Sequence, residues 1–340
     1  MTSNKNTKKN STNKKHTRRL IVGRGTKNKK YKKPRTRGIK KAPLPDDPKK
    51  FKYLNCAPDR IINNNNNKNT CYKNDELMKL KNAWNARYPN TTIDTTDPTA
   101  IWNELKNKTG DYCNNEMCWL NQRFVTDTNI SSLSETAFAP ESPVSWRRNH
   151  NQWLDSDDIK KIMQQYETAY PNFKFIGPTS IDFDTVLGNN KCVWESLCLF
   201  NIKKYILDGI DKIGIIINTD THDKGGSHWI SLFIDLENPQ DMYIYFFNST
   251  GDACPIQITK FVKRVISQYN EYKNTGQANA IKVYSNKGFT HQHGNTECGM
   301  YSLYFISSLL SKKHHYSYFN TVRIPDIAME NLRDEYYNNI

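Results

Sequence analysis

The chain has 340 residues, of which 36% are hydrophobic and 12% aromatic, which predicts about two domains with extensions. No apolar run approaches the roughly 18 residues of a transmembrane helix, and the N-terminus lacks the apolar segment of a secretory signal. Cysteines in a chain of this kind are expected to be free thiols in a reducing compartment and not a disulfide framework. They are Cys56, Cys71, Cys113, Cys118, Cys192, Cys198, Cys254 and Cys298.

The excess positive charge lies at the N-terminus. Residues 1–50 carry 19 Lys and Arg against 2 Asp and Glu, whereas the remaining residues carry 30 against 32. A basic, polar segment cannot bury enough apolar surface to offset its chain entropy, so we expect residues 1–52 to be a disordered basic tail. Such a tail attracts nucleic acid without sequence preference, because binding releases counterions. A nuclear-import signal and a solubilising tail are the alternatives.

A small α-helical domain is predicted at residues 53–140. It contains an Asn-rich spacer at 61–70. Three helical patterns follow the spacer, at 74–88, 96–110 and 115–125. The four cysteines of this region are spaced too irregularly for paired zinc ligands, so small buried thiols are the expected role. The region shows no catalytic set of residues.

A linker at residues 136–145 separates this region from the rest of the chain. It contains two prolines and small residues without a helical or strand period. Beyond the linker, Ser156 is predicted to cap a helix whose first turn carries two aspartates. We therefore place a second domain at residues 145–340.

Two neighbouring segments of this second domain have the composition of β-strands. Residues 227–236 and 241–250 are rich in β-branched and aromatic residues, and turn-forming residues lie between them. In an antiparallel hairpin centred on Asn238, His228 and Asn248 lie opposite or nearly opposite each other at the open end. The pairing predicts an imidazole held by a carboxamide.

Cys298 begins a segment with a broad apolar surface of helical pattern, which Asn295 or Thr296 can cap. In the first turn of a helix the macrodipole favours a thiolate, so we expect a lowered thiol pKa. A thiolate beside an imidazolium is the nucleophile of cysteine hydrolases. Gln292 and the backbone N–H of Cys298 could together stabilise the oxyanion of a tetrahedral intermediate.

Cys298 has two other interpretations. A cysteine that begins an apolar helix is usually a small core residue. His291 and His293 could also form a metal site with Cys298. A metal would occupy the thiol and leave Gln292 without a role, so we predict neither a metal nor a cofactor.

The order of these residues resembles the Ulp1/adenain class of cysteine proteases, and within it the proteases of large DNA viruses. The matching positions are His228-Trp229, Asn248 in FFNSTG, Gln292 and Cys298-Gly299. WLDSDDI at 153–159 resembles the first helix of that fold, and residues 323–337 resemble its last. The resemblance implies an α+β domain with a central mixed or antiparallel sheet flanked by helices. It also implies the catalytic residues Cys298, His228, Asn248 and Gln292.

Asn248 stands where most members of the class carry Asp. An Asn can orient the ring but adds no charge, and Asp252 is the rival third residue. The resemblance implies an endopeptidase that cleaves after Gly-Gly and processes viral core or structural polyproteins. Its expected location is the virion and the viral factory in the host cytoplasm. The alternatives are an isopeptidase for ubiquitin-like modifiers and a nucleic-acid-binding virion protein with an inactive protease fold.

Overall fold

The computed structural model describes residues 50–63, 69–126, 128–188, 190–273 and 281–339. Contacts divide the chain into residues 1–46 and residues 47–340, and the described residues belong to the second unit. The basic tail up to residue 49 and most of the Asn-rich spacer lie outside the description. Among the described residues, no helix combines the length and apolarity needed to cross a bilayer.

The first part of the described chain is helical. Its longest helices are α2 and α3, and Leu77, Leu80 and Trp84 of α2 are buried in a local core. The side chain of Asp97 accepts a hydrogen bond of 2.8 Å from the Ala100 N–H and so caps α3. The third predicted helix is shorter than expected. The elements are α1 (Pro58–Asn63), α2 (Asn74–Arg87), η1 (Pro89–Thr91), α3 (Pro98–Thr109), α4 (Glu116–Leu120), α5 (Thr128–Ser131), α6 (Leu133–Thr136) and η2 (Val144–Arg147).

The prediction of free thiols was wrong for six cysteines. The structure pairs them as Cys56–Cys71, Cys113–Cys118 and Cys192–Cys198. Cys254 and Cys298 are free. The Cα atoms of the pairs are 5.2, 5.5 and 6.2 Å apart, within the range that a disulfide spans. Composition gives no information on which side chains a fold brings together.

A five-stranded mixed sheet organises the second part of the chain, with the strand order β1-β2-β3-β4-β5. The outer pairs β1–β2 and β4–β5 are parallel, whereas β2–β3 and β3–β4 are antiparallel. This confirms the predicted α+β class. The strands are β1 (Phe173–Ser180), β2 (Lys212–Asn218), β3 (Trp229–Asp235), β4 (Tyr243–Phe247) and β5 (Lys282–Ser285).

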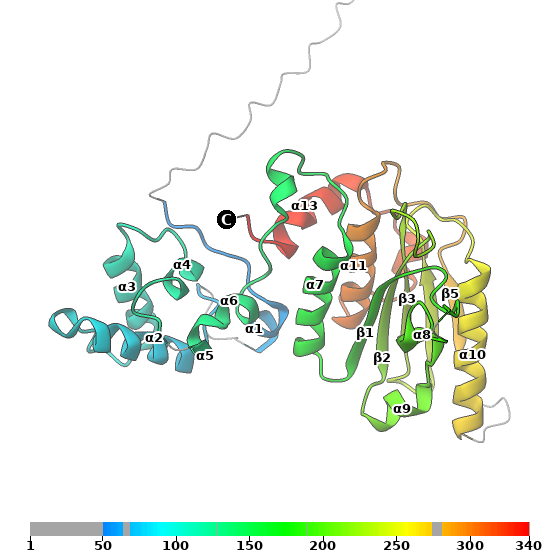
Figure 1. The fold of residues 1–340 in the computed structure, drawn as a ribbon, viewed down its shortest axis with the longest axis horizontal. Helices are drawn as coiled ribbons and strands as arrows, with labels where there is room; N and C mark the ends of the chain where they lie inside the picture. Colours follow the sequence, from blue (N-terminus) through cyan, green and yellow to red (C-terminus); the bar gives the residue numbers. More distant parts are fainter. Residues whose placement is uncertain (1–49, 64–68, 127, 189, 274–280, 340) are drawn as a thin grey trace, which may run out of the picture. The chain divides into compact units, whose positions relative to one another are not determined.

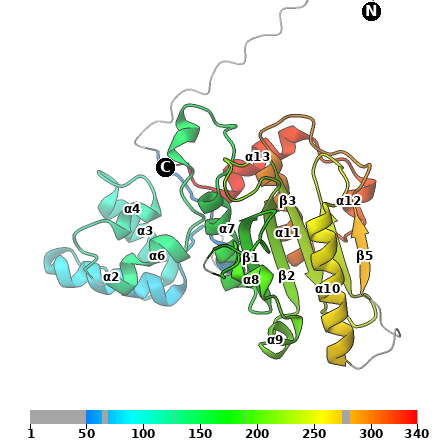
Figure 2. The same ribbon diagram turned by 45° about the vertical axis from the view of Figure 1, so that its right-hand side comes forward.

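Helices cover both faces of the sheet (Figure 1, Figure 2). Side chains alternate along β3, so Phe233 packs with α11 on one face while Leu232 and Ile234 pack with α10 on the other. All residues of α11 are buried. The helices are α7 (Ser156–Ala169), α8 (Glu195–Cys198), α9 (Ile202–Leu207), α10 (Ile256–Lys273), α11 (Cys298–Leu310), α12 (Tyr318–Thr321) and α13 (Asp326–Tyr336).

The cap of α7 is Asp155 and not Ser156 as predicted. The Asp155 carboxylate accepts a bond of 2.9 Å from the Asp158 N–H, and the Asp158 carboxylate accepts one of 3.1 Å from the Asp155 N–H. Two backbone donors are therefore satisfied reciprocally. Ser156 could not form this pair, because the residue three positions after it is Ile159, which has no side-chain acceptor. The reciprocal bonds fix the chain at the point where it leaves Leu154.

The predicted hairpin forms, but its register differs by two residues. Asp235 pairs with Tyr243 and Ser231 with Phe247, so the turn is centred on Pro239 and not on Asn238. Asn248 and His228 therefore lie diagonally and not directly opposite. A shift of two residues keeps each side chain on its face of the sheet.

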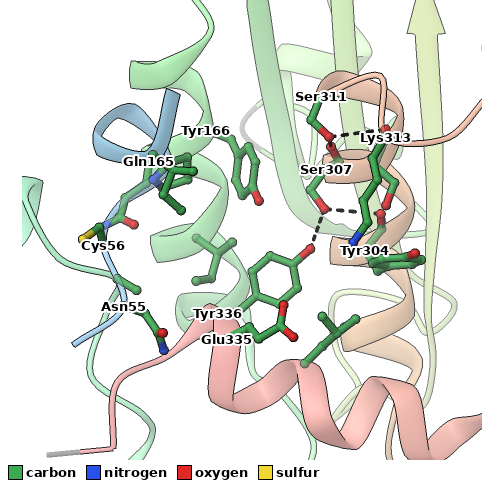
Figure 3. Close-up of a pocket in the computed structure, with 16 residues that line it drawn as sticks. Asn55, Cys56, Gln165, Tyr166, Tyr304, Ser307, Ser311, Lys313, Glu335 and Tyr336 are labelled. Carbon is green, nitrogen blue, oxygen red and sulfur yellow. Dashed lines mark hydrogen bonds between the residues drawn. The ribbon is translucent and has the colours of Figure 1, made fainter. Parts of the chain in front are cut away.

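A pocket of about 310 Å³ lies where the segment from Asn55 to Ile61 meets α7, α11 and α13 (Figure 3). The hydroxyls of Ser307 and Tyr336 share a hydrogen bond of 2.5 Å at its wall, and Tyr166 points toward them. Ser307 is in the last turns of α11, whereas Cys298 begins that helix. This pocket is therefore separate from the region that holds the predicted catalytic residues.

Candidate active site

His228 and Asn248 meet at the end of the hairpin. His228 precedes β3 and is half-buried, whereas Asn248 follows β4 and is buried. The distance from His228 Nε2 to Asn248 Oδ1 is 2.8 Å. Asn248 Oδ1 also accepts from the Thr250 N–H at 3.1 Å, which identifies this atom as the oxygen. The hydrogen of neutral His228 therefore lies on Nε2, and Nδ1 is left as the proton acceptor.

Thr250 separates Asn248 from the rival residue Asp252. The Thr250 hydroxyl lies 2.7 Å from Asn248 Oδ1 and 2.5 Å from Asp252 Oδ2. Asp252 is exposed, and the structure shows no contact between it and His228 within the described residues. Asn248, and not Asp252, therefore bonds directly to the His228 imidazole.

Asn286 holds the backbone of Asn248 from both sides. Its Oδ1 accepts from the Asn248 N–H at 3.0 Å, and its Nδ2 donates to the Asn248 carbonyl at 2.7 Å. Asn286 is fully buried. The sequence analysis missed this residue, because a lone Asn after a short strand has no pattern that distinguishes it from a turn residue.

Cys298 is buried at the first position of α11. The residue after His228, Trp229, contributes a backbone N–H that acts on the thiol. Burial raises the pKa of the Cys298 thiol, while the backbone N–H groups of Trp229, Gly299 and Cys298 act in the opposite direction. The prediction of a lowered pKa was therefore wrong, because it took account of the helix end but not of burial. A thiol of this kind needs a base to form the thiolate.

Gln292 is buried, and its carboxamide is held on both sides. Its Oε1 accepts from the Ser249 hydroxyl at 2.6 Å, and its Nε2 donates to the Gly294 carbonyl at 3.0 Å. The NH₂ group of a carboxamide has two hydrogens, so one further N–H can serve an anion.

The residue before Gln292, His291, is a core residue whose Nε2 lies 2.9 Å from the Phe319 carbonyl. Burial lowers the pKa of His291.

A cleft of about 550 Å³ opens beside Trp229 and is also lined by Trp153, Leu154 and Trp194. The Trp229 indole N–H donates to the Leu154 carbonyl at 2.9 Å. A Cβ atom on Gly299 would lie 3.0 Å from the Leu154 Cβ, which explains the glycine after Cys298. The wall of the cleft is therefore packed directly against the residue that follows the thiol.

Comparison with known proteins identifies this domain. Residues 198–340 match the Ulp1 protease family, C-terminal catalytic domain. Residues 198–340 are therefore similar in sequence to a Ulp1-type catalytic domain. The matched span contains His228, Asn248, Gln292 and Cys298. The chain is accordingly a cysteine-type peptidase.

Viral proteins are similar to much of the chain. A protein of Acanthamoeba polyphaga mimivirus that carries the name of a thiol protease is 29% identical over 279 residues, covering 75% of this chain and 84% of that protein. A protein of African swine fever virus named a SUMO-1 cysteine protease is 28% identical over 211 residues, covering 60% and 73%. The crystal structure of an African swine fever virus protease shares the fold, with a TM-score of 0.57, 22% identity, and coverage of 85% and 97%.

Proposed function

We propose that this Ulp1-family domain hydrolyses peptide bonds with Cys298 as nucleophile, His228 as general base and acid, and Asn248 as the residue that orients the imidazole. Gln292 and the Cys298 backbone N–H are the proposed donors to the oxyanion. The observation that carries the proposal is the bond from His228 Nε2 to Asn248 Oδ1. His228 directly precedes Trp229, whose backbone N–H acts on the Cys298 thiol. The bond to Asn248 leaves Nδ1 of His228 as the free base.

The proposed reaction has two stages, and in each stage His228 accepts one proton and then donates it. His228 Nδ1 takes the thiol proton, and the sulfur attacks the scissile carbonyl carbon to give a tetrahedral oxyanion. The imidazolium then protonates the leaving amine, which departs as the C–N bond breaks. Water, deprotonated by His228, then attacks the thioester carbon, and the C–S bond breaks to release the acid. The imidazolium returns its proton to the departing sulfur, which restores the thiol. Asn248 keeps the ring in the tautomer that each step needs.

We propose that the substrate presents a Gly-Gly pair before the scissile bond and is a viral core or structural polyprotein. Support comes from the likeness to the proteases of large DNA viruses and from the cleft beside Trp229. Large aromatic side chains line this cleft, and residues without a Cβ atom allow the closest approach of a backbone between such walls. The virion and the viral factory are the proposed places of action.

A second candidate substrate is the conjugate of a ubiquitin-like modifier, whose tail also ends in Gly-Gly. One observation favours it: a relative that is 28% identical carries the name of a SUMO-1 cysteine protease. The bond broken would then be an isopeptide bond to a lysine side chain. Ubiquitin-like conjugates assayed beside a Gly-Gly-x polyprotein peptide distinguish the two substrates by the ratio of kcat/KM values.

Thiol labelling with an electrophile built on a Gly-Gly peptide tests the nucleophile. We expect rapid labelling at Cys298 near neutral pH, no labelling at this position in Cys298→Ser, and labelling slowed by about 10²-fold or more in His228→Ala, because the base is lost. Peptide mass spectrometry locates the adduct. The matched control is Cys254→Ser, which removes the other free thiol and should leave the rate unchanged.

One labelling pattern would contradict these roles. Labelling shared between Cys254 and Cys298 at equal rates, and indifferent to His228, would show an unactivated thiol. The proposed roles of Cys298 and His228 would then be rejected.

A further inference from the structure

Arg333 lies behind the candidate active site and is completely buried on α13. Its Nε and Nη2 lie 3.0 and 2.9 Å from one carboxylate oxygen of Glu297. Glu297 is also buried and immediately precedes Cys298. A buried charge of this kind is tolerated when it is paired and its remaining donors are satisfied.

The other donors of Arg333 reach two further segments. Nη1 donates to the Gln152 carbonyl at 2.8 Å, and Nη2 lies 3.3 Å from the Thr296 carbonyl. The guanidinium carbon is 4.6 Å from the centre of the Trp146 ring, a cation–π distance. One planar group thus contacts the turn before the thiol and the segment that leads into the cleft wall.

The two segments tied by Arg333 are those that meet at the reacting groups. Gln152 precedes Trp153 and Leu154, which line the cleft. Leu154 accepts the Trp229 indole bond and packs on Gly299, the residue after Cys298. A shift of the Gln152 carbonyl would therefore move the cleft wall relative to the thiol.

We propose that Arg333 is a positioning residue of this active site, which holds the turn at Glu297 and the cleft wall at Gln152–Leu154 in one fixed arrangement. The inference rests on the proposed role of Cys298 as the nucleophile. Lysine cannot replace arginine here, because a single ammonium group cannot hold both segments while stacking on Trp146. Alignment is the property at stake, since small displacements of reacting groups cost large factors in rate.

Glu297 also acts on the thiol directly. Its negative charge raises the pKa of Cys298, after the larger effect of burial. The other titratable groups that act on the Arg333–Glu297 pair are Tyr301 on α11, Glu330 on α13 and Tyr337 after α13. Removing the Glu297 charge should therefore lower the thiol pKa.

Two reagents separate alignment from reactivity in the full chain. Iodoacetamide needs only the Cys298 thiol, whereas a Gly-Gly electrophile needs the thiol and the cleft wall in register. For Arg333→Lys we expect the rate with the Gly-Gly electrophile to fall about tenfold or more, and the iodoacetamide rate to change by less than about threefold. Loss of folded protein would lower both rates together, so their ratio reports positioning. An unchanged ratio in the folded variant would overturn the proposal.

Glu297→Gln is the second variant, and it decides if Arg333→Lys does not fold. It keeps the shape of the side chain and one acceptor oxygen. We expect the ratio of the Gly-Gly electrophile rate to the iodoacetamide rate to fall in this variant too, because a neutral carboxamide holds the guanidinium less firmly than a carboxylate does. An unchanged ratio in the folded variant would overturn the inference.

Arg60→Lys is the matched control, because Arg60 forms a buried pair with Glu76 at 2.9 Å in the helical region. We expect it to lower the unfolding temperature and leave both rates at Cys298 unchanged. If Cys298 of the wild type reacted no faster than an ordinary thiol, the proposed function itself would be rejected. A reactive wild type with unresponsive variants would reject only the role of Arg333.

Discussion

The bond between Asn248 and His228 gives the candidate site its most specific geometry at the scale of single residues. One oxygen, Asn248 Oδ1, lies within hydrogen-bonding distance of His228 Nε2, the Thr250 N–H and the Thr250 hydroxyl. Since Asn286 fixes the backbone on which this oxygen is carried, the imidazole has one favoured tautomer. A neutral carboxamide is sufficient for this role, because it acts by orientation and not by charge.

Asn248→Ala should therefore lower kcat/KM by about 10- to 100-fold, because His228 loses the acceptor that fixes its tautomer. Asn248→Asp should retain kcat/KM within about threefold of the wild-type value, since a carboxylate accepts the same bond and stabilises the imidazolium. Steady-state hydrolysis of a Gly-Gly-x peptide measures both effects.

Asp252→Ala is the control for this prediction. Asp252 contacts Thr250, is exposed, and should tolerate the change with little loss of kcat/KM. If Asp252→Ala lost as much activity as Asn248→Ala, the assignment of the orienting residue to Asn248 would be wrong.

At the scale of elements, the chain end connects the first helices to the catalytic domain. Asn338 follows α13 and is buried. Its Oδ1 accepts from the Asn55 N–H at 2.7 Å, and its Nδ2 donates to the carbonyls of Asn55 at 3.0 Å and Ala139 at 2.9 Å. One carboxamide thus satisfies three backbone groups from segments far apart in the sequence.

Asn338→Ala should reduce the free energy of unfolding by about 2 kcal/mol, because the substitution leaves buried backbone groups without partners. Thermal or urea unfolding followed by circular dichroism measures the loss. The neighbouring Asn339 is exposed, so Asn339→Ala should change stability by less than about 0.5 kcal/mol. Equal losses in the two variants would show that these hydrogen bonds contribute nothing specific.

At the scale of the whole molecule, the charge is unevenly divided. The first fifty residues carry 19 of the 49 Lys and Arg residues and only 2 of the 34 Asp and Glu residues. Binding to nucleic acid through such a segment depends on the release of counterions and falls steeply with salt. We propose that residues 1–50 tether the peptidase near a packaged genome.

Deletion of residues 1–50 should abolish salt-sensitive binding to DNA and leave peptide hydrolysis intact, because all the proposed catalytic residues lie beyond residue 227. Fluorescence anisotropy with a labelled duplex at two salt concentrations measures binding, and a Gly-Gly-x peptide reports activity on the same samples. Unchanged DNA affinity after the deletion would refute the tether.

The sequence by itself determined the order of the candidate catalytic residues along the chain and most of the local structure. The succession of His228, Asn248, Gln292 and Cys298 pointed to one family, and apolar periodicity predicted the helical pattern at 96–110 in which α3 forms. These signals are local, so they can be read without knowledge of the fold. Even so, the choice of Asp155 over Ser156 as a cap depended on a reciprocal bond that residue preferences alone do not distinguish.

Only the tertiary structure decided the properties that depend on distant partners. It set the hairpin centre at Pro239, paired six cysteines, and raised the pKa of Cys298 by burying it. It also placed Arg333 beside Glu297, 36 residues away in sequence. Burial and pairing are properties of packed elements, and the sequence near a residue does not specify what the fold will place against it.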